Sequence, residues 1–516
     1  MSDVPVLVAG GGPAGLAAAA ELALHGVPCV ILEPRPTVSH RRPRAKTTSI
    51  RTMEHLRRWG LADELRKAAP LPVAWSQRVT FCESLTGARI TDFDGAFGLV
   101  TTRDERFAEA GQQVPQPVVE EVLRAHLARQ ENVELRLGHA ALTLDQQPDH
   151  VTVTARDPAG QLYQITARYV LGADGASGVI REQIGATYAG RSDPRPNFNM
   201  VFRAPKLDSP LGPAVQYWII GSTPGLLGRL DLDGTWRGIV PGVDPRYGEA
   251  HAAELLAGLV GRPFEHELLA TDPWTARMLV ADRFADRRVF LIGESAHVNP
   301  PWGGHGFNTS VGDAVNIAWK IGAVENGWGG PALLDSYERE RRDVVEQTVA
   351  SAEANSRVLA DVLPRDAASI QLAKRPEFHS LGLVLGYSYA GSPIVKPSPA
   401  SKPTAPDTIV YTPSFDPGAR LPHRWLPDGS SLYDHLGPGF TVLTPPGPGD
   451  TPGLRELLQR ASGAGSGIPL AVLPAPPGFP RGDYLLVRPD QHIAWRSGGP
   501  AGLDIGAAAG YPRRRP

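Results

Sequence analysis

Alternating apolar and glycine-rich segments at the start of the chain predict a strand, a tight turn, a helix and a second strand. Residues 4–9 form an apolar run that ends in the glycine-rich turn 10–15. An alanine- and leucine-rich segment, residues 16–25, follows with the composition of a helix. A second apolar run over residues 27–32 ends on Glu33. The order strand, turn, helix, strand, acid is that of a dinucleotide-binding unit.

The glycine-rich turn has the chemistry of a pyrophosphate cradle. Gly10 permits a sharp turn off the strand, Gly12 lets a phosphate approach the backbone, and Gly15 lets the helix pack on the sheet. Free N–H groups and the dipole at the helix start favour the phosphate charge. Glu33 is placed to accept from an adenosine ribose hydroxyl, which favours FAD or NAD over NADP. The expected contacts of this unit are Gly10, Gly12, Pro13, Ala14, Gly15, Glu33, Pro34 and Arg35.

Periodic patterns continue the α/β domain beyond this unit. Apolar positions at helical spacing predict helices within residues 50–61 and 114–127, and alternation predicts a hairpin over residues 79–93. Arg44 stands between a basic loop and the first of these helices, where a cofactor with two phosphates needs a cation. Three further strands are predicted at residues 133–137, 151–155 and 163–167, and the last two form a hairpin that turns at residues 157–160.

Two later strands also end in glycines and acids. Residues 169–171 lead into Asp174, which is a candidate ligand contact because ligands of open α/β sheets bind at the carboxyl ends of strands. An Asp-Gly turn in which the acid only caps the turn explains Asp174 equally well. Residues 288–292 lead into Gly293 and Glu294, then a loop dense in glycine and proline, and then a helix. That helix start can cradle an electron-rich group such as the carbonyl edge of a flavin ring.

Residues 187–282 change from helical to β-type periodicity, and this change predicts an antiparallel sheet inserted into the α/β domain. Such a sheet can form a wall of a substrate pocket. Each candidate wall residue is, on general grounds, more often part of the core. The predicted strands lie at residues 197–204, 214–220, 226–232 and 236–241. The candidate wall residues are Met200, Phe202, Tyr217 and Trp218.

The last part of the chain has a separate organisation. A helix from about Ala332 carries the charged run 337–342, which we expect to be a solvated face. Residues 391–408 have the proline-rich composition of a linker. Beyond it, a short helix at residues 453–460 and several β-type runs predict a smaller domain. Those runs are residues 440–444, 470–473, 484–488 and 492–496.

Composition excludes several classes of function. The 516 residues carry a net charge of −2, so no global field attracts nucleic acid or an anionic membrane. The two cysteines are too few for a disulfide framework or a four-thiolate metal site, and Cys29 reads as a buried hydrophobe. We expect no metal, no nucleic acid and no membrane partner. Without a leader pattern or an apolar segment of bilayer length, a cytoplasmic location is the default.

Together, the three glycine- and acid-bearing stretches resemble those of the FAD-dependent aromatic hydroxylases, single-component flavoprotein monooxygenases with the para-hydroxybenzoate hydroxylase fold. The resemblance covers residues 1 to about 350. Residues 10–15 with Glu33 resemble the ADP-binding turn. Residues 173–177 resemble the Asp-Gly motif, which is associated with both FAD and NAD(P)H use, and residues 293–308 resemble the second FAD stretch.

This resemblance implies a fold and a set of cofactor contacts. The implied fold class is α/β: a Rossmann-like FAD-binding domain with an inserted, mainly antiparallel β substrate domain and a C-terminal thioredoxin-like domain. The implied domains are residues 1–78, 105–186 and 283–392 for FAD, 79–104 and 187–282 for substrate, and 405–516 for the thioredoxin-like part. Further implied FAD contacts are Arg44, Gln116, Asp174, Gly293, Glu294, Pro301, Gly304, Gly306, Phe307 and Asn308.

Three positions depart from the family pattern. Glu294 and Ser295 stand where the family usually has Asp and Ala, and Ser310 stands where it often has Gly. Glu294 keeps the charge but adds a methylene, so either the strand end or the position of the ribityl chain must shift slightly. The C-terminal domain lacks a Cys-x-x-Cys pair, which excludes dithiol chemistry there and favours a structural or homodimer-forming role.

The implied reaction is hydroxylation of a phenolic or polyketide aromatic ring. NAD(P)H reduces FAD, O₂ adds at flavin C4a as a hydroperoxide, and one oxygen atom passes to the substrate. The flavin carries this chemistry, so no residue is assigned a certain catalytic role; the candidates are Pro301, Trp302 and His305. Two rivals stay open: a Baeyer–Villiger or epoxidising monooxygenase, and a non-catalytic flavin-binding protein. A flavin-dependent halogenase would carry a Trp-x-Trp-x-Ile-Pro motif, which is absent.

Overall fold

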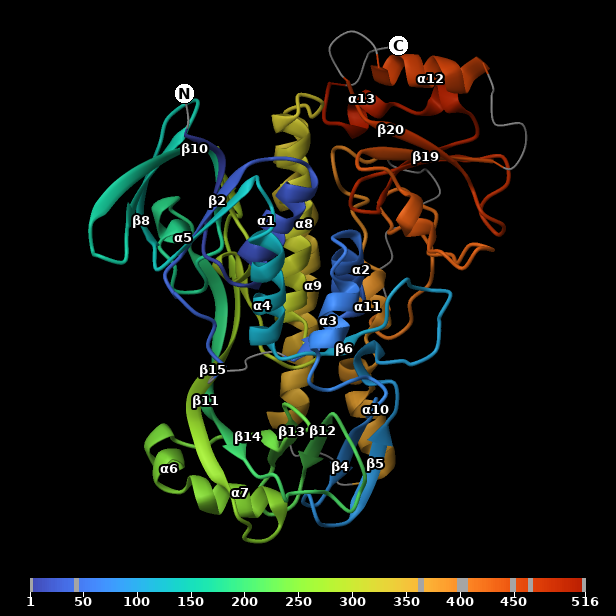
Figure 1. Ribbon diagram of the computed structural model, residues 1–516. Coiled ribbons are helices and arrows are strands. Elements are labelled where there is room, and N and C mark those ends of the chain that lie inside the picture. The colour runs from blue at the N-terminus through green and yellow to red at the C-terminus, as the bar shows by residue number, and fades with distance from the viewer. Residues whose placement is uncertain are drawn as a thin grey trace.

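Three large sheets and the helices around them make up the molecule (Figure 1). The computed structural model describes residues 3–40, 46–360, 366–396, 407–445, 452–462 and 467–512. The N-terminal sheet and the second sheet belong to the first three quarters of the chain, and the third sheet belongs to the C-terminal part.

The first sheet confirms the predicted opening of the chain. Strand β1 (Val4–Ala9) pairs in parallel with β2 (Cys29–Glu33), and α1 (Pro13–Leu24) connects them. The sheet order is β16-β17-β10-β1-β2-β7, and β8 and β9 extend it from β10. The bounds of its other strands are β7 Val133–Leu137, β8 Ala140–Gln146, β9 Val151–Arg156, β10 Leu162–Gly172, β16 Ala285–Asp286 and β17 Val289–Leu291.

Strand β10 joins two segments that the sequence pattern treats separately. Residues 162–167 pair antiparallel with β9, in the predicted hairpin. Residues 169–172 of the same strand pair in parallel with β1, and residues 170–172 with β17. The strand therefore brings the carboxyl ends of β1, β10 and β17 to one edge of the sheet, where the three predicted cofactor stretches begin.

The second sheet confirms the inserted β domain; two of the four predicted strands are longer than predicted and two are shorter. Its order is β18-β15-β11-β14-β13-β12-β4-β5. The helices α6 (Pro245–Ala250) and α7 (Ala252–Val260), as well as β15, were not predicted. The strand bounds are β4 Val79–Cys82, β5 Arg89–Phe93, β11 Tyr188–Arg203, β12 Gln216–Ile219, β13 Gly225–Arg229, β14 Thr235–Pro241, β15 Glu267–Ala281 and β18 His297–Val298.

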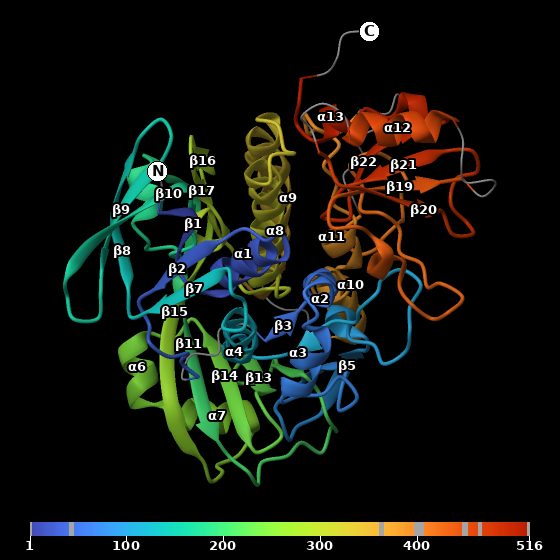
Figure 2. The same ribbon diagram turned by 45° about the horizontal axis from the view of Figure 1, so that its top comes forward.

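Helices α8 (Gly306–Glu325) and α9 (Ala332–Ala360) lie between the first sheet and the C-terminal domain in both ribbon views (Figures 1 and 2). The expectation that residues 337–342 form a solvated face is wrong for three of these six residues. Tyr337, Glu340 and Arg341 are all at most 2 % exposed. They are buried because α9 packs against α8 and meets the C-terminal domain.

The C-terminal sheet has the βαβ–ββα connectivity of thioredoxin-like domains. Strand β19 (Phe440–Thr444) pairs in parallel with β20 (Leu470–Pro474) across α12 (Pro452–Ser462). The antiparallel hairpin β21 (Tyr484–Val487) and β22 (Ile493–Ser497) follows, and then α13 (Ile505–Ala508). Its apolar core is continuous with side chains from α8 and α9.

A buried ionic cluster fastens this domain to the rest of the chain. Glu340 of α9 accepts from Lys320 of α8 at 2.8 Å and from both terminal nitrogens of Arg488, at 2.7 and 2.8 Å. All three side chains are at most 2 % exposed. Burial opposes ionisation of Glu340, but the two cations outweigh it and lower its pKa to about 2.

The remaining helices and short strands position the loops around the site. Those that matter below are β3 (Thr47–Thr48), which pairs with β6 (Gln112–Gln113), and α2 (Ile50–Arg58), which follows β3 directly. The others are α3 Ala62–Ala68, α4 Gln116–Leu127, α5 Ile180–Gln183, α10 Ala367–Phe378 and α11 Leu381–Leu385.

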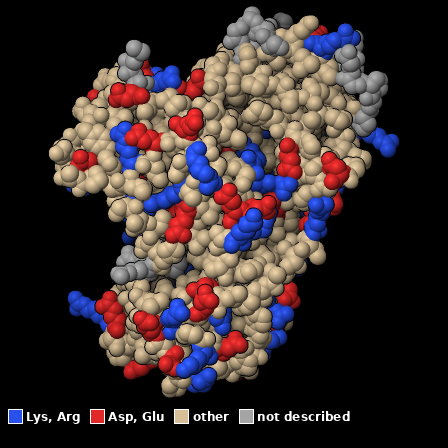
Figure 3. All heavy atoms as spheres, in the orientation of Figure 1, with Lys and Arg blue, Asp and Glu red and all other residues tan. Residues whose placement is uncertain are grey.

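On the face drawn in Figure 3, the described acidic and basic side chains are interspersed. No helix in the described ranges combines the length and apolar character that a bilayer span requires. Within those ranges there is also no group of three or more His, Cys, Asp or Glu side chains that could hold a metal ion. Both cysteines are buried and free.

Candidate active site

In the glycine-rich turn after β1, Gly10 and Gly15 lie close against other backbone atoms, whereas Gly12 faces open space. A Cβ on Gly10, whose φ is +112°, would lie 2.3 Å from the carbonyl oxygen of Ala173. A Cβ on Gly15 would lie 1.9 Å from the oxygen of Gly10. A Cβ on Gly12 would meet nothing within 4 Å, and no side chain caps the start of α1. The turn therefore leaves space and free N–H groups in front of α1.

The acid at the end of β2 belongs to a short polar chain that reaches α4. Glu33 accepts from the N–H of Gly11 at 2.7 Å and from Nε of Arg35 at 2.7 Å. Arg35 also donates to Glu120 at 3.3 Å, and Gln116 donates to Glu120 at 2.8 Å. The structure thus brings together Glu33, Arg35 and Gln116 from distant parts of the sequence. Arg44 lies outside the described residues.

Ser295, one of the positions that depart from the family pattern, joins the Asp-Gly motif (residues 173–177) to the stretch of residues 293–308. Ser295 donates to Asp174 at 2.9 Å and accepts from the N–H of Gly175 at 3.0 Å. The second oxygen of Asp174 accepts from the N–H of Ile180 at 3.0 Å, as a capping residue would. Burial raises the pKa of Asp174, and these donors oppose that effect.

A buried network supports the strand end that carries Gly293. Asp313 of α8 accepts from the N–H of Gly293 at 3.1 Å and lies 2.8 Å from Nε2 of His297. Nε of Arg341 donates to the other oxygen of Asp313 at 2.8 Å. Asp313, His297 and Arg341 are at most 1 % exposed. Glu294, the neighbour of Gly293, is exposed at the surface of this edge.

Asn308 holds the loop of residues 301–308, called the glycine loop below, against β3 and α2. Its amide nitrogen donates to the oxygens of Thr47 at 2.9 Å and Gly304 at 2.7 Å. Its amide oxygen accepts from the N–H of Ser49 and the hydroxyl of Thr52, both at 2.8 Å. Four hydrogen bonds to one side chain give the loop a defined position relative to α2.

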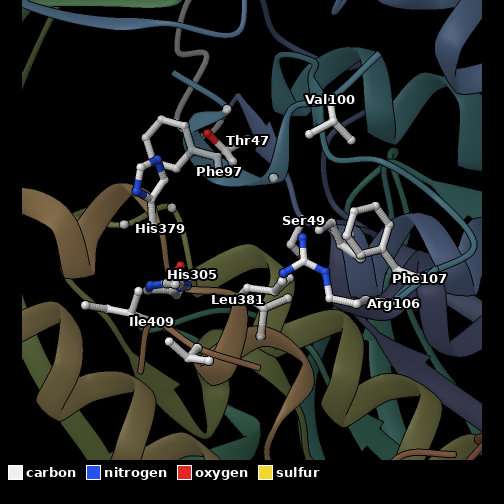
Figure 4. A pocket seen from close by; sticks show the side chains of 18 of the residues that line it. Thr47, Ser49, Phe97, Val100, Arg106, Phe107, His305, His379, Leu381 and Ile409 are labelled. Carbon is white, nitrogen blue, oxygen red and sulfur yellow. The ribbon is translucent and has the colours of Figure 1, made fainter. Parts of the chain in front are cut away.

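A cavity of about 300 Å³ borders this loop at Gly303, Gly304 and His305 (Figure 4). Its apolar lining includes Phe97 and Phe107, and the two described cations at its wall are Arg106 and Arg375. No described acidic side chain lines it. The volume suits a small ring system.

Comparison with known proteins identifies the family. The family described as FAD binding domain matches residues 3–352, and the one described as aromatic-ring hydroxylase, C-terminal, matches residues 415–510. Aklavinone 12-hydroxylase from Streptomyces purpurascens is 30% identical, and 2,4-dichlorophenol 6-monooxygenase from Delftia acidovorans is 29% identical; each match covers 96% of this chain and 95% of the relative. A structure of the flavin-dependent monooxygenase PieE with FAD and substrate matches with a TM-score of 0.87 at 28% identity, covering 99% of both chains. The chain belongs to the FAD-dependent aromatic-ring hydroxylases.

The turn at residues 10–15 fits the pyrophosphate of FAD, as expected for an aromatic-ring hydroxylase. Gly12 has an extended backbone, with φ −78° and ψ −176°, which any residue can adopt. The absence of a side chain at this position therefore leaves room for a ligand and is not needed for the backbone conformation. That open space lies at the positive end of the α1 dipole. The residues that would hold the adenosine end are those of the turn together with Glu33 and its neighbours.

The four candidate wall residues of the hydroxylase divide between the two faces of the second sheet, and three of them need correction. Met200, Phe202 and Tyr217 are at most 2 % exposed and pack in the core between the sheet and α7. Trp218 belongs instead to the cluster that contains Trp302 of the glycine loop. The alternation of side chains along a strand makes this division, because Tyr217 and Trp218 must face opposite ways.

The three catalytic candidates occupy different environments. Pro301 is exposed, and Trp302 packs with its ring centroid 6.1 Å from Trp218 and 6.2 Å from Trp274. His305 is 5 % exposed, and no described residue bonds to its Nε2. Burial lowers the pKa of His305 to about 4, so its imidazole is neutral near pH 7.

The sequence interpretation missed several residues of this region. Ser49 caps α2 and donates to Asn308, and a serine just before a helical pattern is a signal that could have found it. Trp274 lies on β15, which was not predicted, and so escaped notice. Lys46 and Arg237 are buried on the Trp218 face of the second sheet, and no sequence signal separates them from surface cations.

Proposed function

We propose that this FAD-dependent enzyme uses NAD(P)H and O₂ to hydroxylate a phenolic or polyketide aromatic substrate. One observation carries the proposal: the glycine loop of residues 301–308 lines the cavity with Gly303, Gly304 and His305, and its Trp302 packs against Trp218 and Trp274 of the second sheet. The names of the relatives, an aklavinone hydroxylase and a dichlorophenol monooxygenase, support an aromatic substrate.

The chain's own residues bind, orient and exclude water in this proposal. When bound, FAD supplies the electron transfer and the oxygen-transfer chemistry. The turn at Gly12, which has open space in front of it, would hold the pyrophosphate, and Asn308 keeps the glycine loop fixed against α2. The rings of Trp218 and Trp302 exclude water and offer flat apolar surfaces to an aromatic ring.

We assign the C-terminal domain a structural role. Its strands carry no cysteine, since the only two cysteines of the chain are Cys29 and Cys82. The contacts of Arg488 with Glu340 support attachment rather than catalysis. Sedimentation analysis of the full chain tests the homodimer that remains part of this proposal.

A product assay tests the function. The purified holoenzyme is incubated with NADH or NADPH, ¹⁸O₂ and a panel of phenols and polyketide aromatics. We expect substrate-stimulated NAD(P)H oxidation and a product heavier by one ¹⁸O atom on the ring. A lactone or an epoxide would replace the hydroxylase assignment by its oxygenating rival. No stimulation and no labelled product with any compound would favour a non-catalytic flavin-binding protein.

A further inference from the structure

A phenylalanine with a left-handed backbone lies in the wall of the cavity. Phe97 has φ +59° and ψ +20°, in a short turn after β5. A bulky residue rarely adopts this conformation, because its Cβ then crowds the backbone. Gly95 and Gly98 of the same turn have φ +62° and +73° without that cost. On conformational grounds, a glycine would suit position 97 better than the phenylalanine does.

Backbone hydrogen bonds on both sides hold this turn in place. The N–H of Ala96 donates to the oxygen of Gln77 at 3.1 Å, and the oxygen of Gly98 accepts from the N–H of Gly111 at 3.0 Å. A Cβ on Gly98 would lie 2.5 Å from Cδ1 of Ile50, so the turn also packs closely on α2. Strained residues that their surroundings hold in this way cluster at binding sites. The fixed turn keeps the phenylalanine ring in one place, as expected of a residue that shapes a site.

The side chain of Phe97 contacts two apolar regions. Among the described residues, it is the one hydrophobic side chain that both lines the cavity and packs against the cluster of Trp218 and Trp302. Most of the other apolar lining residues, Phe107 among them, belong to a separate cluster around Ile50. Figure 4 shows Phe97 and Phe107 on different sides of the cavity. Phe97 therefore stands where the cavity adjoins the aromatic cluster.

The ring of Phe97 meets the ring of Phe378 edge to face. Their centroids are 5.5 Å apart and their planes cross at 87°. The centroid of Phe378 in turn lies 6.1 Å from that of Trp218. Flat apolar rings of this kind are surfaces against which the fused rings of a ligand can pack. With Phe97 in place, its own ring takes up this contact with Phe378.

We propose that Phe97 limits the size of the aromatic substrate that the cavity admits. The inference rests on the proposed function and narrows its substrate class to small ring systems. The volume of about 300 Å³ suits a ligand of about two fused rings. A longer ligand would have to extend toward Phe378, and the ring of Phe97 occupies that position.

Two phenols of different size test this limit in the holoenzyme. We would titrate 2-naphthol and 1-hydroxypyrene, and follow binding by the change in flavin absorbance. Both are flat and uncharged, and they differ mainly in the number of fused rings. We expect the wild-type enzyme to bind 2-naphthol at least tenfold more tightly. Equal affinity for the two, or tighter binding of 1-hydroxypyrene, would overturn the proposal.

Variants at position 97 locate the effect. Phe97→Gly relieves the backbone and removes the ring, so it should abolish the preference by raising the affinity for 1-hydroxypyrene at least tenfold. Phe97→Tyr keeps the ring and should keep the preference. If Phe97→Gly does not fold, Phe97→Leu makes the same test. A variant without the ring that still prefers 2-naphthol tenfold contradicts the assignment. So does an equal loss of affinity for both phenols, which is the result expected if the ring only supports the fold.

Phe107→Ala is the matched control. It removes a second ring from the wall of the same cavity, on the side of the other apolar cluster. We expect the preference for 2-naphthol to stay within threefold of the wild-type value. The same gain for 1-hydroxypyrene in Phe107→Ala as in Phe97→Gly would mean that cavity volume alone decides, and would refute the role of Phe97.

The outcome separates this inference from the proposed function. Labelled oxygen in hydroxylated 2-naphthol, with a ligand preference that Phe97→Gly does not change, would refute the size limit and keep the hydroxylase. A preference that Phe97→Gly abolishes, with no oxygenated product from any phenol, would keep the size limit on binding and refute the hydroxylase.

Discussion

The hydroxyl of Ser295 donates a 2.9 Å hydrogen bond to the carboxylate of Asp174, a residue 121 positions earlier in the chain. The same hydroxyl accepts from the N–H of Gly175, so one side chain ties the third cofactor stretch to the second. The family usually has alanine at this position, and alanine could make neither bond. The departure therefore adds a link between two strand ends that meet at the cofactor edge of the first sheet.

Replacing Ser295 by alanine, the usual family residue, should cost stability. The change removes a bond to an acid at a fully buried position, which is worth about 1.5–3 kcal/mol for a charged partner. We expect a lower urea midpoint with FAD still bound, because Asp174 keeps the N–H of Ile180. Ser310→Ala is a suitable control, since among the described residues the hydroxyl of Ser310 bonds only to the oxygen of Gly306 in its own helix. An unchanged midpoint for Ser295→Ala would show that the link carries no stability.

Gly12→Val should abolish FAD binding while the apoprotein still folds. A side chain at Gly12 meets open space in the described structure and needs no unusual backbone, so folding should survive. The same space is where the pyrophosphate is expected. Gly10→Val is the contrasting variant, because its Cβ would lie 2.3 Å from the oxygen of Ala173 and should prevent correct packing. Absorbance at the flavin bands and circular dichroism measure the two effects; FAD bound at full stoichiometry to Gly12→Val would refute the assigned turn.

Much of the first domain could be predicted because its signals are local. The turn at Gly10, the hairpin at residues 157–160 and the start of α8 after the glycine loop depend on glycine conformation and short-range periodicity. The long strands β11 and β15 do not depend on such local signals. Their exposed first halves lack alternation, and their pairing joins residues that are 64 (Arg203 and Glu267) to 93 (Tyr188 and Ala281) positions apart.

The orientation of side chains and the burial of charged residues could not be predicted from the sequence. Strand periodicity says that Tyr217 and Trp218 face opposite ways, and only the position of α7 decides which of them is core. Glu340 and Arg341 have the pattern of a solvated helix face. They are buried because Arg488 and Asp313, far away in the chain, supply matching charges.

His305 should make the protein less stable in mild acid. Its folded pKa of about 4 lies below the usual 6.5, so the unfolded chain binds its proton more readily between these values. Stability from this group is present above pH 6.5 and is lost as the pH falls toward 4, by about 3 kcal/mol in total. His305→Gln should therefore lose less stability than the wild type between pH 7 and pH 5. Urea unfolding at both values measures the difference.

The control for this comparison is His40→Gln, which removes a largely exposed imidazole. It should follow the wild-type pH dependence. A His305→Gln protein with the same pH dependence as the wild type would mean that the imidazole of His305 is not held neutral in the folded state.

Adjacent residues on β12 should have separable effects on catalysis and stability. Trp218→Leu removes a ring from the face that meets Trp302, and we expect the KM for an aromatic substrate to rise about tenfold, as expected for the loss of an aromatic contact of roughly 1.4 kcal/mol. Tyr217→Phe removes a hydroxyl that donates to the oxygen of Gly212 and accepts from the N–H of Ala214. That variant should lose about 1 kcal/mol of stability with KM unchanged. Steady-state kinetics and urea unfolding of both variants test the division. A larger rise in KM for Tyr217→Phe than for Trp218→Leu would place the substrate on the opposite face of the sheet.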